Sequence, residues 1–447
     1  MTTDGERRLH LNAFLMTPGH HDAAWRHPLS SPERATDVTY FTELARTAER
    51  GTLDSIFFAD GLAVWHRIGS NVSGGLEPLT LLSAIAVATE RIGLISTAST
   101  TFNEPFTLAR MFASLDHISH GRAGWNIVTS GNVAEANNFN LDEHIEHAVR
   151  YERADEFVEV AKKLWDSWAD DAVLLDKASG RYADPAKVRQ IEHVGKHFKV
   201  RGPLNVQRSP QGWPLLVQAG SSEDGRDFAA RHAEAIFTAQ QTLADAQTFY
   251  KDVKTRAERL GRDPDGVKIL PGICPILGST ESEARRLEEE LTELQVLDYG
   301  LTQLANMLGV DPATLSALPL DGPLPEELLP AEADINGNKS RFTLVSELAR
   351  RDRLTIRQII ARLGGGRGHR VFAGTPEQVA DQLEEWFRNG AADGFNVMPP
   401  VLPAGLEDFV DHVVPVLRRR GLFRTEYTGR TLRDHYGLLR PSGEASR

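Results

Sequence analysis

The chain of 447 residues has a single cysteine, Cys274, and no apolar run near the ~20 residues that a membrane span needs. One cysteine excludes an intramolecular disulfide framework and a cysteine-rich metal site. The polar start MTTDGERR is not typical of a secretory signal peptide. Basic residues are scarce relative to acidic ones, and the net charge of −12 disfavours nucleic acids and anionic membranes as partners. These absences predict a cytoplasmic protein that acts on a small molecule.

The sequence also lacks the ligand pattern of a metal-dependent barrel hydrolase. Such an enzyme carries His-x-His after its first strand and further ligands after later strands. Here His20 and His21 are adjacent, and two later strand ends carry Gln218 and Thr238. No Gly-x-Ser-x-Gly motif or Cys/His pair indicates a covalent nucleophile. We therefore predict neither a metal site nor a covalent intermediate on the protein.

What the sequence does contain is a regular alternation of short apolar runs and amphipathic helical patterns. Most of the runs are continuously apolar, which is typical of parallel strands covered on both faces. Eight such alternations predict a (β/α)8 TIM barrel rather than a doubly wound sheet. The predicted strands are Leu9–Phe14, Ser55–Ala59, Ile92–Thr97, Arg122–Val128, Pro214–Gln218, Ala235–Thr238, Val267–Ile276 and Gly394–Val397.

The length of the chain predicts large insertions in that barrel. A plain barrel needs about 250 residues, so we expect one domain over residues 1–447 with insertions on the βα loops at 61–76, 131–212 and 277–370. The last of these suits a lid over a substrate pocket, with Gly364–Gly368 as a flexible hinge; a second helical layer or an oligomer contact is an equal alternative. Residues 441–447 look like a disordered tail.

Polar residues stand at the ends of several predicted strands, where the active site of such a barrel lies. Asp60 follows the second strand, Thr97 ends the third and Asn126 lies in the fourth. Hydroxyl and amide groups suit a ligand with several hydrogen-bonding edges better than they suit proton transfer. This combination favours a heterocyclic cofactor, although Asp60 alone also fits a structural cap.

A turn after the fifth strand has the composition of an anion site. Gly220, Ser221 and Ser222 open a helical segment, whose first N–H groups are free to bind phosphate. An ordinary serine N-cap is the alternative. After the first strand, His20, Trp25 and His27 are predicted to line the substrate pocket.

Taken together, eight ordered motifs resemble the bacterial luciferase-like flavin monooxygenases, in the branch that acts on nitrilotriacetate, EDTA and dibenzothiophene sulfone. The motifs are LNAFLMTPGHHDAAWRHP, FFAD, STTFNEPF, LDHISHGRAGWNIVTS, RYERADEFVEV, GPLNVQRSPQGWPLLVQAGSSEDGRDFAARHAE, VFAGTPEQVADQLEEWF and DGFNVMPP. The resemblance implies reduced FMN (FMNH2) supplied by a separate NAD(P)H-dependent flavin reductase, and O2 as the oxidant. It further implies a substrate of the sulfone, thioether or aminopolycarboxylate type, a role in xenobiotic degradation, and a homodimer or homotetramer.

The resemblance also assigns roles to residues. It places Asp60 and Thr97 at the flavin ring and Asn126 beside its reactive edge, with Thr97 and Asn126 as the catalytic pair. Tyr151 and the turn Gly220-Ser221-Ser222 hold the phosphate. Members that oxidise long-chain alkanes carry a cysteine near the first strand and a histidine after VTS, whereas here Gly131 follows VTS, which disfavours an alkane substrate.

Two other functions remain compatible with the pattern. A deazaflavin (F420)-dependent dehydrogenase shares the barrel and the phosphate turn, although such proteins are usually shorter and lack the WRHP segment. A barrel that binds flavin without catalysis is the second alternative.

Overall fold

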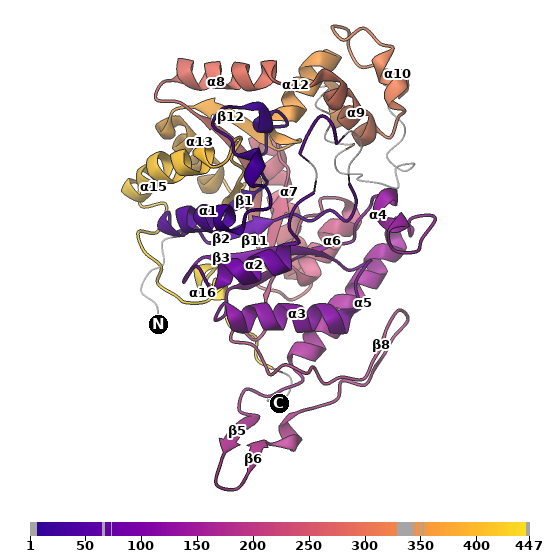
Figure 1. Ribbon diagram of the computed structural model, residues 1–447, viewed down its shortest axis with the longest axis vertical. Helices are drawn as coiled ribbons and strands as arrows, with labels where there is room; N and C mark the ends of the chain where they lie inside the picture. The colour runs from indigo at the N-terminus through magenta and orange to yellow at the C-terminus, as the bar shows by residue number, and fades with distance from the viewer. Residues whose placement is uncertain are drawn as a thin grey trace.

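A closed barrel of eight parallel strands forms the centre of the computed structural model (Figure 1), which describes residues 7–64, 68–72, 74–328, 342, 345–347, 349–350 and 353–443. The strands run in the order β10-β9-β4-β3-β2-β1-β13-β11, and β10 pairs with β11 to close the barrel. All eight predicted strands are confirmed, each to within two residues at either end. They are β1 (His10–Leu15), β2 (Ser55–Phe58), β3 (Gly93–Ser99), β4 (Ala123–Val128), β9 (Leu215–Gln218), β10 (Ala235–Thr238), β11 (Lys268–Leu277) and β13 (Gly394–Val397).

Amphipathic helices cover the outside of the barrel, and several begin at residues that the sequence marks as caps. The side chains of Asp37, Thr242 and Thr375 each accept a backbone N–H in the first turn of a helix. The covering helices are α1 (Val38–Arg50), α2 (Pro78–Ala86), α3 (Pro105–Ile118), α5 (His147–Trp165), α6 (Glu223–His232), α7 (Leu243–Arg259), α13 (Pro376–Arg388), α14 (Ala404–Asp408) and α15 (Val414–Arg419).

Strand register arranges the barrel interior in layers. In parallel strands, residues paired in register point to the same side of the sheet. Phe57 pairs with Ile95, and Ile95 pairs with Gly124, so these three positions face the interior together. Because side chains alternate along a strand, Thr97 and Asn126, two residues further on, also face inward, one layer nearer the carboxyl ends of the strands.

The C-terminal segment closes the amino-terminal end of the barrel, a feature that the sequence did not predict. Helix α16 (Leu432–His435) inserts Leu432 beneath the interior layers, where Gly93 leaves room for it. The Tyr436 ring stacks on the His10 ring at a centroid distance of 4.8 Å, and its hydroxyl donates to Asn12. The described C-terminal segment therefore covers the end of the barrel opposite to the carboxyl ends of the strands.

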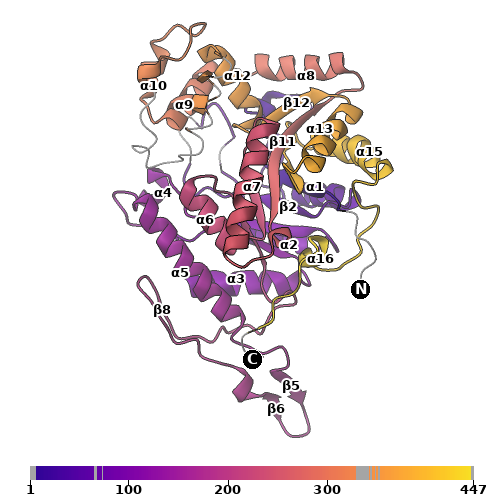
Figure 2. The ribbon, with the colours of Figure 1, turned by 180° about the vertical axis from the view of Figure 1, so that it is seen from behind.

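Several short strands in the insertions were not predicted either. Strand β12 (Arg370–Gly374) pairs with the second half of β11, outside the closed barrel. Two hairpins follow α5: β5 (Val173–Asp176) with β6 (Arg181–Ala183), and β7 (His193–Val194) with β8 (Lys199–Val200). Both views show them extending from the end of the molecule opposite α8, α9, α10 and α12 (Figures 1 and 2).

The described residues of the stretch 277–370 form a helical unit with its own apolar core, here called the cap. Its described elements are α8 (Glu281–Glu293), α9 (Leu297–Leu308), α10 (Pro312–Ser316), a 3-10 turn (Glu326–Leu328) and α12 (Ile356–Gly366). Leu304, Leu308, Val345 and Ile359 are among the residues that meet in the core of the cap.

One local prediction was wrong, the glycine hinge. Gly364, Gly365 and Gly366 form the buried last turn of α12, where this helix packs closely against Gln295 and Val371. Of the predicted tail, residues 441–443 are described, and the carbonyl of Pro441 accepts a hydrogen bond from buried Arg208. Residues 444–447 lie outside the described part of the chain.

Candidate active site

Thr97 and Asn126 meet inside the barrel mouth. The Asn126 Nδ2 donates to Thr97 Oγ1 at 2.8 Å, and both residues are buried. Asn126 Oδ1 is also buried, yet no group in the described chain bonds to it. A buried amide oxygen without a partner is costly, so Asn126 Oδ1 is available to a group that donates a hydrogen bond near the carboxyl ends of the strands. The register and this hydrogen bond place Thr97 and Asn126 side by side, while their predicted catalytic role stays a prediction.

The turn after β9 brings Ser221, Ser222 and Tyr151 together at the start of α6. Ser222 caps the helix by accepting the N–H of Gly225 at 3.2 Å, and Ser221 shares a hydrogen bond of 3.1 Å with Thr238. The Tyr151 hydroxyl lies so close to Gly220 that a Cβ there would be 3.0 Å away from it. Three hydroxyl groups therefore surround the positive end of a helix of ten residues.

The groups around this turn have defined hydrogen-bonding and ionic partners. Burial raises the pKa of Tyr151, although hydrogen bonds to Ser222 and Thr129 partly oppose the shift, so the phenol is a neutral donor at pH 7. Glu223 forms ion pairs with Arg226 and Arg256, and Asp224 contacts the imidazole of His147 at 3.0 Å. The N–H groups and hydroxyls at the start of α6 suit a phosphate.

Asp60 stands two residues past the end of β2, next to the strand that carries Thr97. Partial burial of its carboxyl group raises its pKa, and the nearby carboxylates of Glu77 and Glu135 add to the effect. The residue itself is exposed at the barrel mouth.

The three residues predicted to line the substrate pocket lie on one loop but face different neighbours. His20 is fully buried, with its ring against Phe14 and its Nε2 bonded to the Phe14 carbonyl at 2.9 Å. Burial lowers the pKa of His20 to about 3, and the charge of Arg367 adds to the effect, so the imidazole is neutral. Trp25 instead donates to the carbonyl of Ser70, and His27 lies near Glu290 of α8.

An ion pair and a hydrogen bond, together called the clamp, join the loop after β1 to the cap, and neither was predicted from the sequence. Arg367 pairs with Asp22 at 3.1 Å, and the N–H of Asp22 donates to the carbonyl of Gly364 at 2.9 Å. Next to this pair, the His369 ring lies parallel to that of Phe237 at 4.7 Å. The sequence carried one signal of this clamp, the run Gly364–Gly368 around Arg367, which we interpreted only as a hinge.

Gln218 is a second polar residue at this site that was not predicted as a binding group. It ends β9, two residues before Gly220, and a Cβ on Gly220 would lie 2.3 Å from its Nε2. Its Oε1 is buried and has no hydrogen-bond partner in the described chain. A side chain at position 220 would therefore displace the amide of Gln218.

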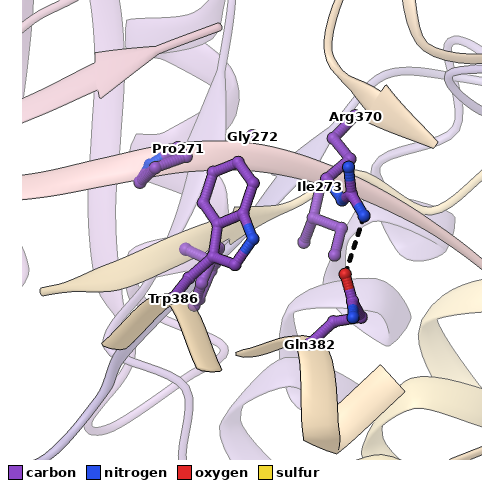
Figure 3. A pocket seen from close by; sticks show the side chains of 7 residues that line it. Pro271, Gly272, Ile273, Arg370, Gln382 and Trp386 are labelled. Carbon is purple, nitrogen blue, oxygen red and sulfur yellow. Dashed lines mark hydrogen bonds between the residues drawn. The ribbon is translucent and has the colours of Figure 1, made fainter. Parts of the chain in front are cut away.

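Three further observations on the described part of the chain concern metal ligands, membrane helices and a crevice away from the barrel mouth. No group of three or more His, Cys, Asp or Glu residues there is placed to hold a metal ion, and no helix is long and apolar enough to cross a membrane. A crevice on the outer wall of the barrel, between β11 and α13, is too narrow to admit water. Arg370 closes it by donating to Gln382 at 2.7 Å (Figure 3).

The chain is similar to known proteins in both sequence and fold. The family model for luciferase-like monooxygenases matches residues 14–393. The chain is 52% identical to N-acetyl-S-(2-succino)cysteine monooxygenase of Bacillus subtilis (strain 168), covering 98% of each chain. It is 51% identical to nitrilotriacetate monooxygenase component A of Aminobacter aminovorans, covering 99% of each. A riboflavin lyase solved with modified FMN and riboflavin superposes with a TM-score of 0.86 and 31% identity, over 98% of this chain and 99% of that chain.

Proposed function

This chain belongs to the luciferase-like monooxygenases, and from that premise we propose that it is the oxygenase component of a two-component system. In this proposal it takes reduced FMN from a separate NAD(P)H-dependent flavin reductase in the cytoplasm. It then inserts one atom of O2 into a small organic substrate, while the second atom leaves as water and FMN is released oxidised. The observation that carries the proposal is that two features lie on neighbouring strands. One is the amide oxygen of Asn126 on β4, which has no partner among the described residues, and the other is the start of α6 after β9, with its free N–H groups and hydroxyls.

The described residues fit an FMN molecule that spans these two features. Ser221, Ser222 and Tyr151 would hold the phosphate, and Asn126 Oδ1 would accept a hydrogen bond from the flavin ring. Asp60 would stand at the rim of the ring site. Reduced flavin supplies the two electrons that activate O2. In this proposal the protein holds the ring against β3 and β4 and positions O2 beside the hydrogen-bonded pair of Thr97 and Asn126.

Exclusion of water is the second task that we assign to the protein. A reactive oxygen species on a flavin is lost when water or stray protons reach it, so the site must close during turnover. The cap is placed for this role, because the Asp22–Arg367 pair links it to the loop that carries His20. Buried His20 and His21 stay neutral at pH 7, with pKa values lowered by burial to about 3 and about 4, and therefore do not donate protons readily.

The two relatives indicate the substrate class. Nitrilotriacetate is an amine, and N-acetyl-S-(2-succino)cysteine a thioether, each bearing several carboxylates. We propose a carboxylated amine or thioether as the substrate, ahead of a sulfone. We assign one of these carboxylates to Arg367 at the cap–barrel junction, whose charge acts on His20 and whose guanidinium also pairs with Asp22.

A substrate panel tests the function directly. The purified chain, FMN, a flavin reductase and NADH are mixed with thioethers, sulfones and aminopolycarboxylates under 18O2. We expect one labelled oxygen atom in the product of a carboxylated amine or thioether, and no product without the reductase. Hydride transfer to F420 in the absence of O2 would instead identify the dehydrogenase, and no O2 uptake above the reductase background would identify a flavin-binding protein.

Removing the polar groups of Thr97 and Asn126 separates catalysis from cofactor binding. Thr97→Val and Asn126→Leu keep the shape of each side chain but remove its hydrogen bonds, so we expect product formation to fall about 100-fold in each variant. FMN affinity should fall by less than product formation, because Ser221, Ser222 and Tyr151 are unchanged in both variants. The measurement is single-turnover product yield from anaerobically reduced FMN, with Ser114→Ala on the exposed face of α3 as the control. Full product yield in both variants would contradict the assigned role.

A further inference from the structure

Three polar side chains, here called the relay, connect the loop after β10 with the turn after β9. Gln240 donates from its Nε2 to Thr238 Oγ1 at 2.9 Å, and Thr238 Oγ1 lies 3.1 Å from Ser221 Oγ. Thr238 ends β10, which pairs with β9, so its hydroxyl stands next to the turn that carries Ser221. The helices that follow the two strands, α6 and α7, pack side by side (Figure 2). The relay therefore joins two neighbouring loops at the carboxyl ends of the strands.

The relay has a direction, because the nitrogen of a side-chain amide only donates. Thr238 Oγ1 accepts the hydrogen of Gln240, so its own hydrogen is left for its second partner, Ser221. Ser221 Oγ then accepts from Thr238 and keeps its own hydrogen for a further acceptor. Successive hydrogen bonds also polarise one another, which makes the last hydroxyl of such a series a better donor.

Ser221 differs in this respect from the other two hydroxyls at the start of α6. Ser222 accepts the N–H of Gly225 as the helix cap, and a hydrogen bond joins Ser222 to Tyr151. These two hydroxyls orient each other, whereas the side-chain partner of Ser221 among the described residues is Thr238 alone. The direction in which Ser221 donates is therefore set by the loop after β10.

The loop that carries Gln240 is held in place before any ligand binds. Thr238 is 2% exposed and Gln240 is 8% exposed, so the relay is shielded from water. The next residue, Gln241, donates from its side chain to the carbonyl of Gly368 at 2.8 Å, and its own carbonyl accepts from Arg370 at 2.8 Å. Because these contacts fix the loop, orienting Ser221 requires no further ordering when the ligand arrives.

We propose that Thr238 and Gln240 are positioning residues, which make Ser221 a hydrogen-bond donor and thereby favour FMN over riboflavin. The phosphate of FMN offers acceptor oxygens, whereas the terminal hydroxyl of riboflavin both donates and accepts. A serine whose oxygen is already engaged by Thr238 suits the phosphate better than the hydroxyl. This inference rests on the proposed function, since it assumes that the turn after β9 holds the phosphate of FMN.

The ratio of the dissociation constants of riboflavin and FMN tests the relay, because effects on both flavins cancel in it. Both constants are measured by quenching of flavin fluorescence. In Thr238→Val and in Gln240→Leu, we expect FMN to bind about fivefold more weakly and riboflavin to bind as before. Thr238→Ser keeps the hydroxyl and should retain the wild-type ratio. The matched control is Gln241→Leu, the same substitution one residue further on, which leaves the relay intact and should also retain the ratio.

A double-mutant cycle shows whether the relay acts through Ser221. Ser221→Ala should weaken FMN binding about tenfold, and adding Gln240→Leu should weaken it no further. A further loss in the double variant, or an equal loss of both flavins in Thr238→Val and Gln240→Leu, would overturn the inference, because the two residues would then act on the fold in general.

The wild-type ratio separates the inference from the proposed function. A wild type that prefers FMN, with the same preference in Thr238→Val and Gln240→Leu, would overturn the relay and leave the phosphate site in place. A wild type that binds the two flavins equally well would overturn both.

Discussion

A variant with both Ser221→Asp and Ser222→Asp is expected to bind FMN at least about 100-fold more weakly than the wild type. One added carboxylate about 4 Å from the phosphate near a protein surface is repelled by about 4 kcal/mol. At half of that energy each, the two carboxylates weaken binding by about 4 kcal/mol, which exceeds the ~2.8 kcal/mol that corresponds to 100-fold in affinity. The helix itself should not suffer, because aspartate is as good an N-cap as the serine that it replaces at position 222. A loss of affinity would therefore report on the phosphate rather than on folding.

The affinity is measured by quenching of flavin fluorescence. At about −0.3 kcal/mol for each of its ~31 heavy atoms, FMN should bind the wild type with sub-micromolar affinity. A 100-fold weaker dissociation constant is then still measurable. The control is Ser279→Asp with Ser282→Asp, which adds the same charge around the N-terminus of α8. If FMN binds the Ser221/Ser222 variant as tightly as it binds this control, the phosphate lies elsewhere. Ser221→Ala with Ser222→Ala should lose less, since only hydrogen bonds are removed.

The barrel and its catalytic end could be predicted from the sequence because both follow from local patterns. A buried parallel strand is an apolar run, and the polar residue that ends it lies at the site by the geometry of the fold. The positions of Thr97 and Asn126 side by side inside the barrel follow from this rule and from the pairing of β3 with β4. The turn at Ser221 was predictable for a similar reason, because a glycine and two hydroxyls before a helix are a local signal.

The features that escaped prediction depend on contacts between distant parts of the chain. Leu432 fills the bottom of the barrel because Gly93, over 300 residues earlier, has no side chain, and neither residue signals this alone. Arg367 reaches the active-site loop through Asp22, a pairing that no local pattern encodes. The glycines before Arg367 were misread for the same reason: their use in tight helix packing is visible only when Gln295 and Val371 are placed beside them.

The largest effect on stability is expected at the bottom of the barrel, from Asp54→Asn. Asp54 is fully buried, accepts the N–H of Leu11 at 2.7 Å, and pairs with Arg424 and His10. Burial alone would raise its pKa, but the charges of Arg424 and His10 outweigh that effect and lower the pKa to about 2. Removing the carboxylate leaves Arg424 largely buried without its counter-charge, which should reduce the free energy of unfolding by about 3–5 kcal/mol.

The same interaction predicts a pH dependence with a definite sign. Because the folded-state pKa of Asp54 lies below its ordinary value of 3.8, the stabilisation is complete above about pH 5 and is lost as the pH falls toward 2. Urea unfolding of wild type and Asp54→Asn between pH 7 and pH 3 should therefore show a difference in the free energy of unfolding that becomes smaller as the pH falls.

Asp411→Asn, which breaks an exposed pair with Arg50, is the control and should reduce the free energy of unfolding by less than about 1 kcal/mol. Adding Arg424→Met to Asp54→Asn should recover much of the loss, since the buried charge is then removed. If Asp54→Asn alone unfolds no more easily than Asp411→Asn, the C-terminal segment does not depend on this ion pair for its attachment to the barrel.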